Sequence, residues 1–363
     1  MTYTFNRVLI AGESTPAINT RDIHQLIAAE FAGDVQALDV DLSLDKATQT
    51  LIDAGLTVIC EPDLTDPTSW GQPGTDTWLV AGHDKPSVNP VAATPQPETA
   101  AGYNIGGVGT LLALAGLDPK LAYASSKDVE NQIVDKYGSW SAITAREGVW
   151  YSNLELLRHV RSLALQNIGN RRLRVASATE RPLLGLDSTL AMDENGHPVN
   201  VIEPATLGAL TAFYNVYTQV GESEKLTQSA QSAGQIPNSY ARQIGSGGGL
   251  GIGALAMGLR GSLHQLSDVL IEATQLEDEL AKTDLLIEII PTLHPQTIAD
   301  SPLQKLGELA ATHAVPVILF THESSLSNHE LAEWGIHAAY VVSANSSLDK
   351  VRRVLRGTWI RPA

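Results

Sequence analysis

A glycine-rich segment near residue 250 is the part of this sequence best suited to contact a ligand. Five of the seven positions from Gly245 to Gly251 are glycine, and an apolar run of small residues continues to Met257. Glycine permits positive φ angles and close approach to the main chain, whereas inside a helix it costs about 1 kcal/mol per residue. The pattern predicts a loop that enters a helix near Gly249, where unpaired N–H groups can bind an anion. Close packing of a small-residue helix against a neighbouring element is an equally good interpretation.

The same segment partly matches a dinucleotide-binding motif. Gly249, Gly251 and Ala254 have the G-x-G-x-x-A spacing, and Glu272 lies at a plausible distance for the acid that binds ribose. The motif requires a buried strand before the glycines, and the preceding N-S-Y-A-R-Q-I is a poor strand. A Walker P-loop is excluded because the chain contains no Gly-Lys pair. A dinucleotide-binding enzyme is therefore kept as a second alternative.

Histidines are frequent in the C-terminal third of the chain. His294 and His322 follow predicted strands, where ligands of parallel sheets bind. The histidines are scattered and lack the spacing of metal ligands. We therefore predict no metal site from the residues themselves.

Composition limits the class of protein. The chain has 363 residues, a net charge of −16 and 43% hydrophobic residues, which indicates at least two domains with full cores. The negative charge argues against a nucleic-acid partner. Cys60 is the single cysteine, so no internal disulfide can form. With no signal peptide and no apolar run of about 20 residues, we expect a cytoplasmic protein without a membrane partner.

Two stretches of the chain show alternating strands and helices. Apolar strands are predicted at 7–11, 35–40, 56–60 and 77–81, and again at 285–290, 317–321 and 338–342, with helices between them. This alternation favours an α/β fold with parallel sheets. We predict one domain from residues 1–85 plus 283–363, and an inserted α/β domain from 98–282 that carries the glycine-rich segment. A small-molecule ligand is expected in the cleft between the domains.

Several motifs resemble those of bacterial glycerate kinases, the two-domain type that phosphorylates glycerate with ATP. The stretch 245–256 reads G-S-G-G-G-L-G-I-G-A-L-A and is similar to the family's P-G-[SA]-G-A-A-G-G-x-G block. The stretches T-D-L-L-I-E-I-I-P-T-L-H-P-Q-T at 283–297 and A-V-P-V-I-L at 314–319 follow at the family's spacing, and R-P-L-L-G at 181–185 matches its P-L-L-G. The resemblance implies a flavodoxin-like domain from both chain ends with an inserted α/β domain. It also implies ATP and Mg as cofactors.

The resemblance identifies candidate site residues. The candidate cofactor-binding residues are Gly245, Gly247, Gly248, Gly249 and Gly251. The candidate catalytic residues are Ser14, His294 and Gln296: Ser14 and Gln296 retain the family's residue, and His294 takes the place of its aspartate.

The departures from the family fall on polar motifs. Pro16 stands at the position of a lysine, and Glu288-Ile289-Ile290-Pro291 replaces T-G-E-G. Phosphoryl transfer depends on cationic groups, metal-binding carboxylates and N–H donors around the γ-phosphate, and loss of one donor typically costs about 10²- to 10³-fold in rate. We therefore expect glycerate kinase activity that is weak, altered or absent. The alternative is a non-catalytic relative that binds a metabolite or a protein partner.

Overall fold

The computed structural model describes residues 5–12, 20–30, 33–59, 63–82, 106–138, 148–191, 204–226, 239–294, 298, 301–342 and 347–359. The chain divides into two compact units, of which the first contains Met1–Ala54 and Leu266–Ala363 and the second Gly55–Gln265. Within the described ranges, no helix is both long and apolar enough to cross a bilayer.

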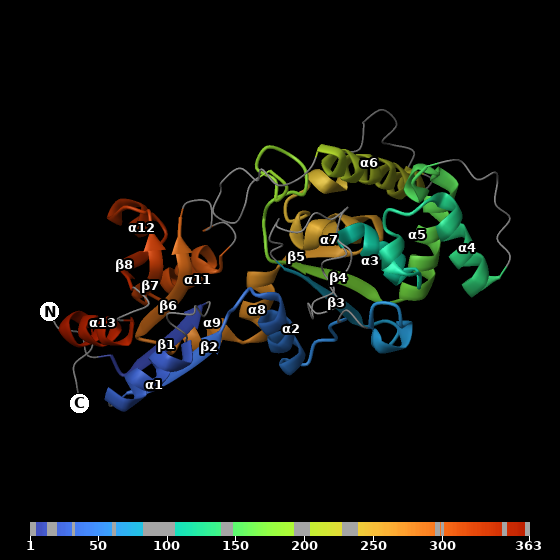
Figure 1. The fold of residues 1–363 in the computed structure, drawn as a ribbon. Coiled ribbons are helices and arrows are strands. Elements are labelled where there is room, and N and C mark those ends of the chain that lie inside the picture. Colours follow the sequence, from blue (N-terminus) through green and yellow to red (C-terminus); the bar gives the residue numbers. More distant parts are fainter. Residues whose placement is uncertain are drawn as a thin grey trace. The chain divides into compact units, whose positions relative to one another are not determined.

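The first unit is built from both ends of the chain, drawn in blue and in orange to red in Figure 1. Its elements are β1 (Arg7–Gly12), α1 (Thr20–Glu30), β2 (Asp34–Asp39), α2 (Leu44–Asp53), α8 (Leu266–Ala273), α9 (Leu276–Leu280), β6 (Leu285–Leu293), α11 (Leu303–Thr312), β7 (Val317–Ser324), α12 (Asn328–Glu333), β8 (Ile336–Val341), α13 (Ser347–Val354) and a π-helical turn at Leu355–Trp359.

The five strands of this unit form one parallel sheet in the order β2-β1-β6-β7-β8. Numbered within the unit, the order is 2-1-3-4-5, which is that of flavodoxin. The prediction of a parallel α/β sheet from both chain ends is confirmed.

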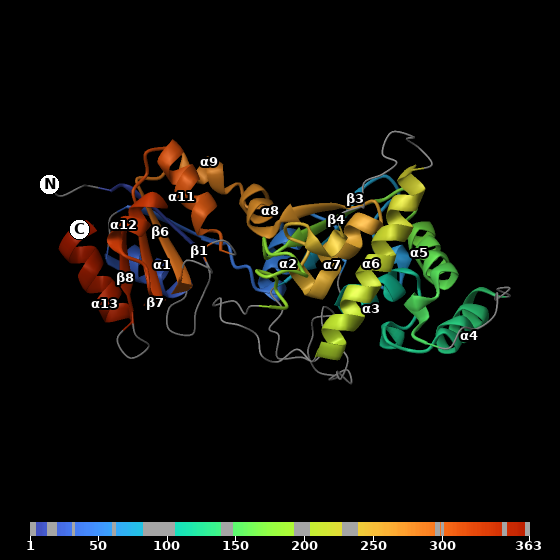
Figure 2. The same ribbon diagram turned by 90° about the horizontal axis from the view of Figure 1, so that it is seen from above.

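Helices cover both faces of the sheet because its strands are apolar on both sides. On one face, Ile23 and Ile27 of α1 and Val351 of α13 pack against Ile10, Ile287 and Phe320 of the strands. On the other face, Leu303 of α11 and Leu331 of α12 pack against Ile290 and Leu319. Figures 1 and 2 show these two helix pairs on either side of β6 and β7.

The second unit contains a smaller parallel sheet in the order β3-β4-β5. Its elements are β3 (Asp76–Ala81), α3 (Gly106–Leu114), α4 (Ser126–Tyr137), α5 (Leu154–Ile168), β4 (Arg172–Ser177), α6 (Pro204–Leu226), α7 (Gly248–Gly258), β5 (Ser262–Gln265) and 3-10 helices at Pro67–Ser69, Pro119–Leu121, Trp150–Ser152 and Tyr240–Arg242. Helix α7 packs against the sheet, and α3 and α6 pack against α7.

The boundaries of the two compact units differ from those of the predicted domains. We expected residues 1–85 to enter the first sheet, but β3 pairs with β4, and Val58 forms an isolated bridge to Trp78. The first part of the first unit therefore ends at Ala54, and the chain re-enters this unit after Gln265 instead of after Lys282. An apolar strand looks alike in either sheet, so its local pattern does not specify which sheet it joins.

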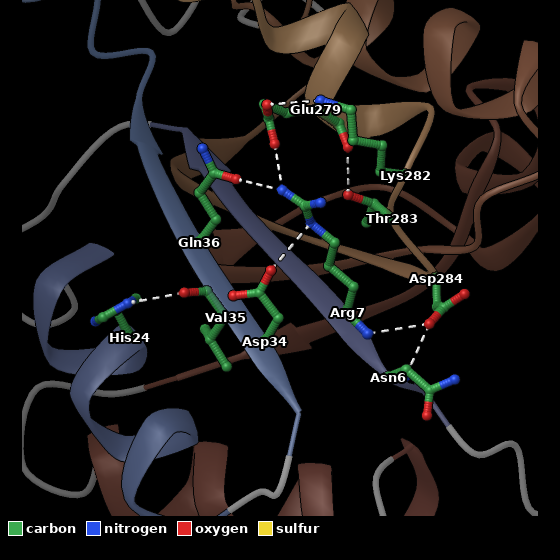
Figure 3. Close-up of polar contacts among 10 residues, drawn as sticks. All are labelled: Asn6, Arg7, His24, Asp34, Val35, Gln36, Glu279, Lys282, Thr283 and Asp284. Atoms are coloured by element: carbon green, nitrogen blue, oxygen red, sulfur yellow. Dashed lines mark hydrogen bonds and ion pairs between the residues drawn. The ribbon is translucent and has the colours of Figure 1, made fainter.

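Polar contacts join the two chain ends at the amino-terminal edge of the first sheet (Figure 3). A single carboxylate oxygen of Asp284, just before β6, accepts hydrogen bonds from the backbone N–H groups of Asn6 (2.7 Å) and Arg7 (3.0 Å). The Arg7 guanidinium donates to Gln36 (2.9 Å) and forms an ion pair with Glu279 of α9. These contacts connect β1, β2 and the segment that leads into β6. They therefore help to fix the register in which β6 pairs with β1.

Removing the Asp284 carboxylate should destabilise the first unit. We expect Asp284→Ala to lower the free energy of unfolding by about 1.5 kcal/mol or more, because two backbone donors lose a charged acceptor. Urea denaturation with a fluorescence readout measures this loss. Glu272→Ala, an exposed carboxylate on α8, is the control and should change stability by less than about 0.5 kcal/mol. Equal losses in the two variants would contradict the role assigned to Asp284.

Candidate functional site

The glycine-rich segment has an unusual backbone. Gly249, Leu250 and Gly251 are consecutive left-handed residues, with φ of 59°, 47° and 95°, and regular helix follows them in α7. Leucine at positive φ is strained, by about 1–3 kcal/mol, and persists only where the surroundings fix the backbone. We refer to these three residues as the left-handed turn. Sequence reasoning predicted the loop and the helix but not this run of three.

The amide groups of the segment donate to protein carbonyls. The N–H of Gly245 donates to Glu180 O (2.8 Å) and that of Gly247 to Arg181 O (3.0 Å), both in the loop after β4. The N–H of Gly249 donates to Gly82 O, just after β3 (3.1 Å). The segment therefore lies at the carboxyl ends of β3 and β4, where α/β proteins bind ligands. In this conformation, however, these three N–H groups already donate hydrogen bonds to protein carbonyls.

Close approach explains why these positions are glycine. A Cβ at Gly248 would lie 2.3 Å from the Ser177 hydroxyl oxygen, and a Cβ at Gly247 would lie 2.9 Å from Arg181 O. All residues from Gly245 to Gly251 are buried. This geometry supports close packing as the reason for the glycines, and their cofactor-binding role stays a prediction.

Two tyrosines of α6 reach the carbonyls of α7. The Tyr214 hydroxyl donates to Gly251 O (2.8 Å) and the Tyr217 hydroxyl donates to Leu255 O (2.9 Å). Tyr214 and Tyr217 are three residues apart, so they lie on one face of α6, but this spacing does not indicate which groups they contact. Burial raises the pKa of Tyr214 well above 10, and the nearby phenols of Tyr123 and Tyr217 raise it further. The Tyr214 hydroxyl therefore remains a donor at any physiological pH.

The dinucleotide motif lacks its structural context. The residues before the glycines form a 3-10 helix, Tyr240–Arg242, where the motif requires a strand. Glu272 lies within α8, not at the end of a strand.

The first unit has its own candidate edge, at the carboxyl ends of β1 and β6. The strand order reverses between these two strands, and ligands of open α/β sheets bind at such a point. His294 follows the last residue of β6 and is half-buried. Ser14 and Gln296 lie outside the described residues, so of the candidate catalytic residues the structure places His294. It belongs to the first unit, and the glycine-rich segment belongs to the second.

Residues 288–291, which the resemblance aligns with the family's T-G-E-G, lie within β6. Glu288 has no exposed surface and pairs in register with Ala11 of β1 and Leu319 of β7. Ile289 pairs with Gly12 and Phe320 and is also fully buried. A Cβ at Gly12 would lie 2.2 Å from Ile289 O, so β1 and β6 are in tight contact here.

Asp41 follows β2 and is a further buried carboxylate that the sequence did not single out. Burial by itself raises the pKa of Asp41, but hydrogen bonds from Lys46 (2.6 Å) and Ser43 outweigh it and hold this pKa below 3.8. The carboxylate is thus engaged at the start of α2. Across the described ranges, no three His, Cys, Asp or Glu side chains are placed to hold a metal ion. The described side chains therefore supply no ligand cluster for the Mg that the resemblance implies.

The steric account of the glycines predicts opposite effects at two positions. Gly251→Ala should destabilise the protein by about 3 kcal/mol or more, because it places a Cβ 2.1 Å from the Tyr214 hydroxyl oxygen at a φ of 95°. Gly208→Ala, at an exposed position of α6 with no atom within 4 Å of the new Cβ, should stabilise it by about 0.5–1 kcal/mol. Thermal unfolding measures both changes. A tolerated alanine at 251 would contradict the account.

Comparison with known proteins assigns the chain to a family. The model of the glycerate kinase family matches residues 151–356, which is more than half of the chain. A search of curated proteins finds no match. Among solved structures, the crystal structure described as "putative glycerate kinase 2" from Salmonella typhimurium LT2 is 14% identical, with a TM-score of 0.51. The similarity covers 97% of this chain and 96% of that chain, and at this identity it shows a shared fold. This protein belongs to the glycerate kinase family.

Proposed function

We propose that this protein is a glycerate kinase-like protein in which ATP-dependent phosphorylation of glycerate is weak or absent. The observation that carries the proposal is the regular pairing and burial of β6. Its backbone pairs with β7 without interruption from Leu286 to Ile290, across the first three of the four positions that the resemblance aligns with T-G-E-G. The first three of the replacing residues, Glu288 to Ile290, are all buried.

A paired, buried strand cannot do what a glycine turn does. A glycine turn can approach phosphate groups and offer N–H donors to the charge that develops during transfer. Ile289 and Ile290 instead contribute side chains to the two hydrophobic cores, and Pro291 has no N–H to donate. Loss of one such donor costs about 10²- to 10³-fold.

The glycine-rich segment supports the same conclusion. Three of its amides donate to main-chain carbonyls of the second unit, so a phosphate would have to displace those bonds or use other donors. No step through ATP·Mg follows from the described residues.

The alternative is a non-catalytic relative that binds a metabolite or a protein partner. The observation that favours it is that the Gly245, Gly247 and Gly249 amides donate to protein carbonyls, while tight backbone contacts at Gly12, Gly248 and Gly251 maintain the scaffold whether or not phosphate is transferred. The two functions differ in turnover, not in fold.

Steady-state kinetics tests the proposal. With glycerate and ATP·Mg, we expect kcat/KM at least about 10²-fold below that of a glycerate kinase with an intact T-G-E-G motif, measured in the same coupled assay. Thermal shift then separates the alternatives, because a retained nucleotide site stabilises the protein by about 2.7 kcal/mol at 100-fold over Kd. Turnover equal to that of the intact enzyme would contradict the proposal.

Any residual activity should depend on His294. We expect His294→Ala to lower residual kcat/KM by about 10²-fold or more if this side chain transfers a proton. His313→Ala is the matched control. His313 is also a half-buried histidine of the first unit, but it follows helix α11 and not a strand of the sheet. If both variants retain activity, His294 has no catalytic role.

A further inference from the structure

Two side chains of β5 pair a hydroxyl group with an imidazole. The Oγ atom of Ser262 and the Nε2 atom of His264 lie 2.8 Å apart, which is within hydrogen-bond reach. Leu263 between them faces α7, because a Cβ on Gly253 of that helix would lie 3.2 Å from its Cδ1 atom. Successive side chains of a strand point to opposite faces, so Ser262 and His264 point away from α7. Ser262 is exposed and can be reached from solvent.

Neighbouring strands orient the imidazole and place a cation beside the hydroxyl. The ring of Trp78 in β3 packs against His264, with 5.2 Å between the ring centroids. Arg174 of β4 pairs in register with Ser262, so these two side chains are adjacent on the same face of the sheet. The Arg174 guanidinium lies over the Trp78 ring, 5.5 Å from its centroid, and the Arg174 Nε atom is 2.8 Å from Asp76 Oδ2. These two contacts hold the cation in place.

This arrangement has the parts of an activated nucleophile. A serine hydroxyl is a weak nucleophile by itself, and a general base within about 2.6–3.2 Å activates it when a third group orients that base. The Nε2 atom of His264 accepts the Ser262 proton when the ring carries its own proton on Nδ1. A neighbouring cation stabilises the negative charge that develops on a carbonyl oxygen under attack. Ser262, His264 and Arg174 therefore match the three roles of an acyl-transfer site.

Ser69 provides an internal comparison. It is also an exposed serine of the second unit. Its hydroxyl donates to the backbone carbonyls of Asp66 (2.8 Å) and Asp63 (3.3 Å). A backbone carbonyl accepts a hydrogen bond but does not take up the proton at neutral pH, so these acceptors do not activate Ser69 as a nucleophile.

We propose that Ser262 is a nucleophile for acyl transfer from small esters, with His264 as its general base and Arg174 as the group that stabilises the oxyanion. Ser262 Oγ forms a bond to the carbonyl carbon of the ester, and the bond from that carbon to the leaving oxygen breaks. The leaving oxygen departs with the electron pair, and the proton of the Ser262 hydroxyl passes to His264 Nε2. This site lies within the second unit and does not depend on phosphorylation of glycerate.

Acetylation by p-nitrophenyl acetate tests this activity in the full-length protein. Mass spectrometry of peptides over time measures the rate at each serine. We expect Ser262 to be acetylated at least about 10²-fold faster than Ser69, because a positioned general base contributes about 10²- to 10⁴-fold. His264→Gln and Arg174→Gln should each slow acetylation of Ser262 by about 10²-fold or more.

Ser69→Ala is the matched control and should leave acetylation of Ser262 unchanged. Thermal unfolding verifies that each variant is folded, and the comparison of the two serines in the wild-type protein needs no variant. Equal acetylation of Ser262 and Ser69 in the wild-type protein would overturn the proposal, and so would a wild-type rate at Ser262 in His264→Gln. A wild-type rate in Arg174→Gln would show that Arg174 does not stabilise the oxyanion.

Discussion

Backbone contacts that tolerate no side chain are the constraint on which the second unit depends. The chain from Gly245 to Gly251 passes so close to the ends of β3 and β4 that a single Cβ would displace Ser177 or an adjacent carbonyl. Such closeness lets main-chain groups of the segment donate to main-chain carbonyls of the two strand ends. The energy gained there offsets the entropy cost of the glycines and the strain at Leu250.

The first unit meets a different requirement, because its sheet combines strands that are more than 240 residues apart in the sequence. Apolar faces of α1, α13, α11 and α12 close the two layers, but such contacts are not directional and do not fix a register. Directional polar contacts do that. Asp284 binds the N–H groups at the start of β1, and Arg7 connects that strand to α9 (Figure 3).

In both units, buried contacts stabilise the fold at positions where the resemblance to glycerate kinases predicts ligand-binding motifs. In β6, Ile289 and Ile290 add core contacts on opposite faces of the sheet, which stabilises the fold. In the second unit, the tyrosines of α6 secure the glycine-rich helix through its carbonyls. Stability therefore does not require phosphate transfer.

The sequence by itself determined the elements whose signals are local. The strands and helices from Leu285 to Val354, the parallel α/β class and the need for glycine near residue 250 follow from periodicity and composition, because these report burial and backbone freedom. Only the tertiary structure decided that β3 joins β4, that β5 exists, and that the amides of Gly245, Gly247 and Gly249 face carbonyls. Each of these depends on a partner far away in the chain. A local pattern shows that a strand is buried or that a glycine is required, but it does not identify the group on the other side of the contact.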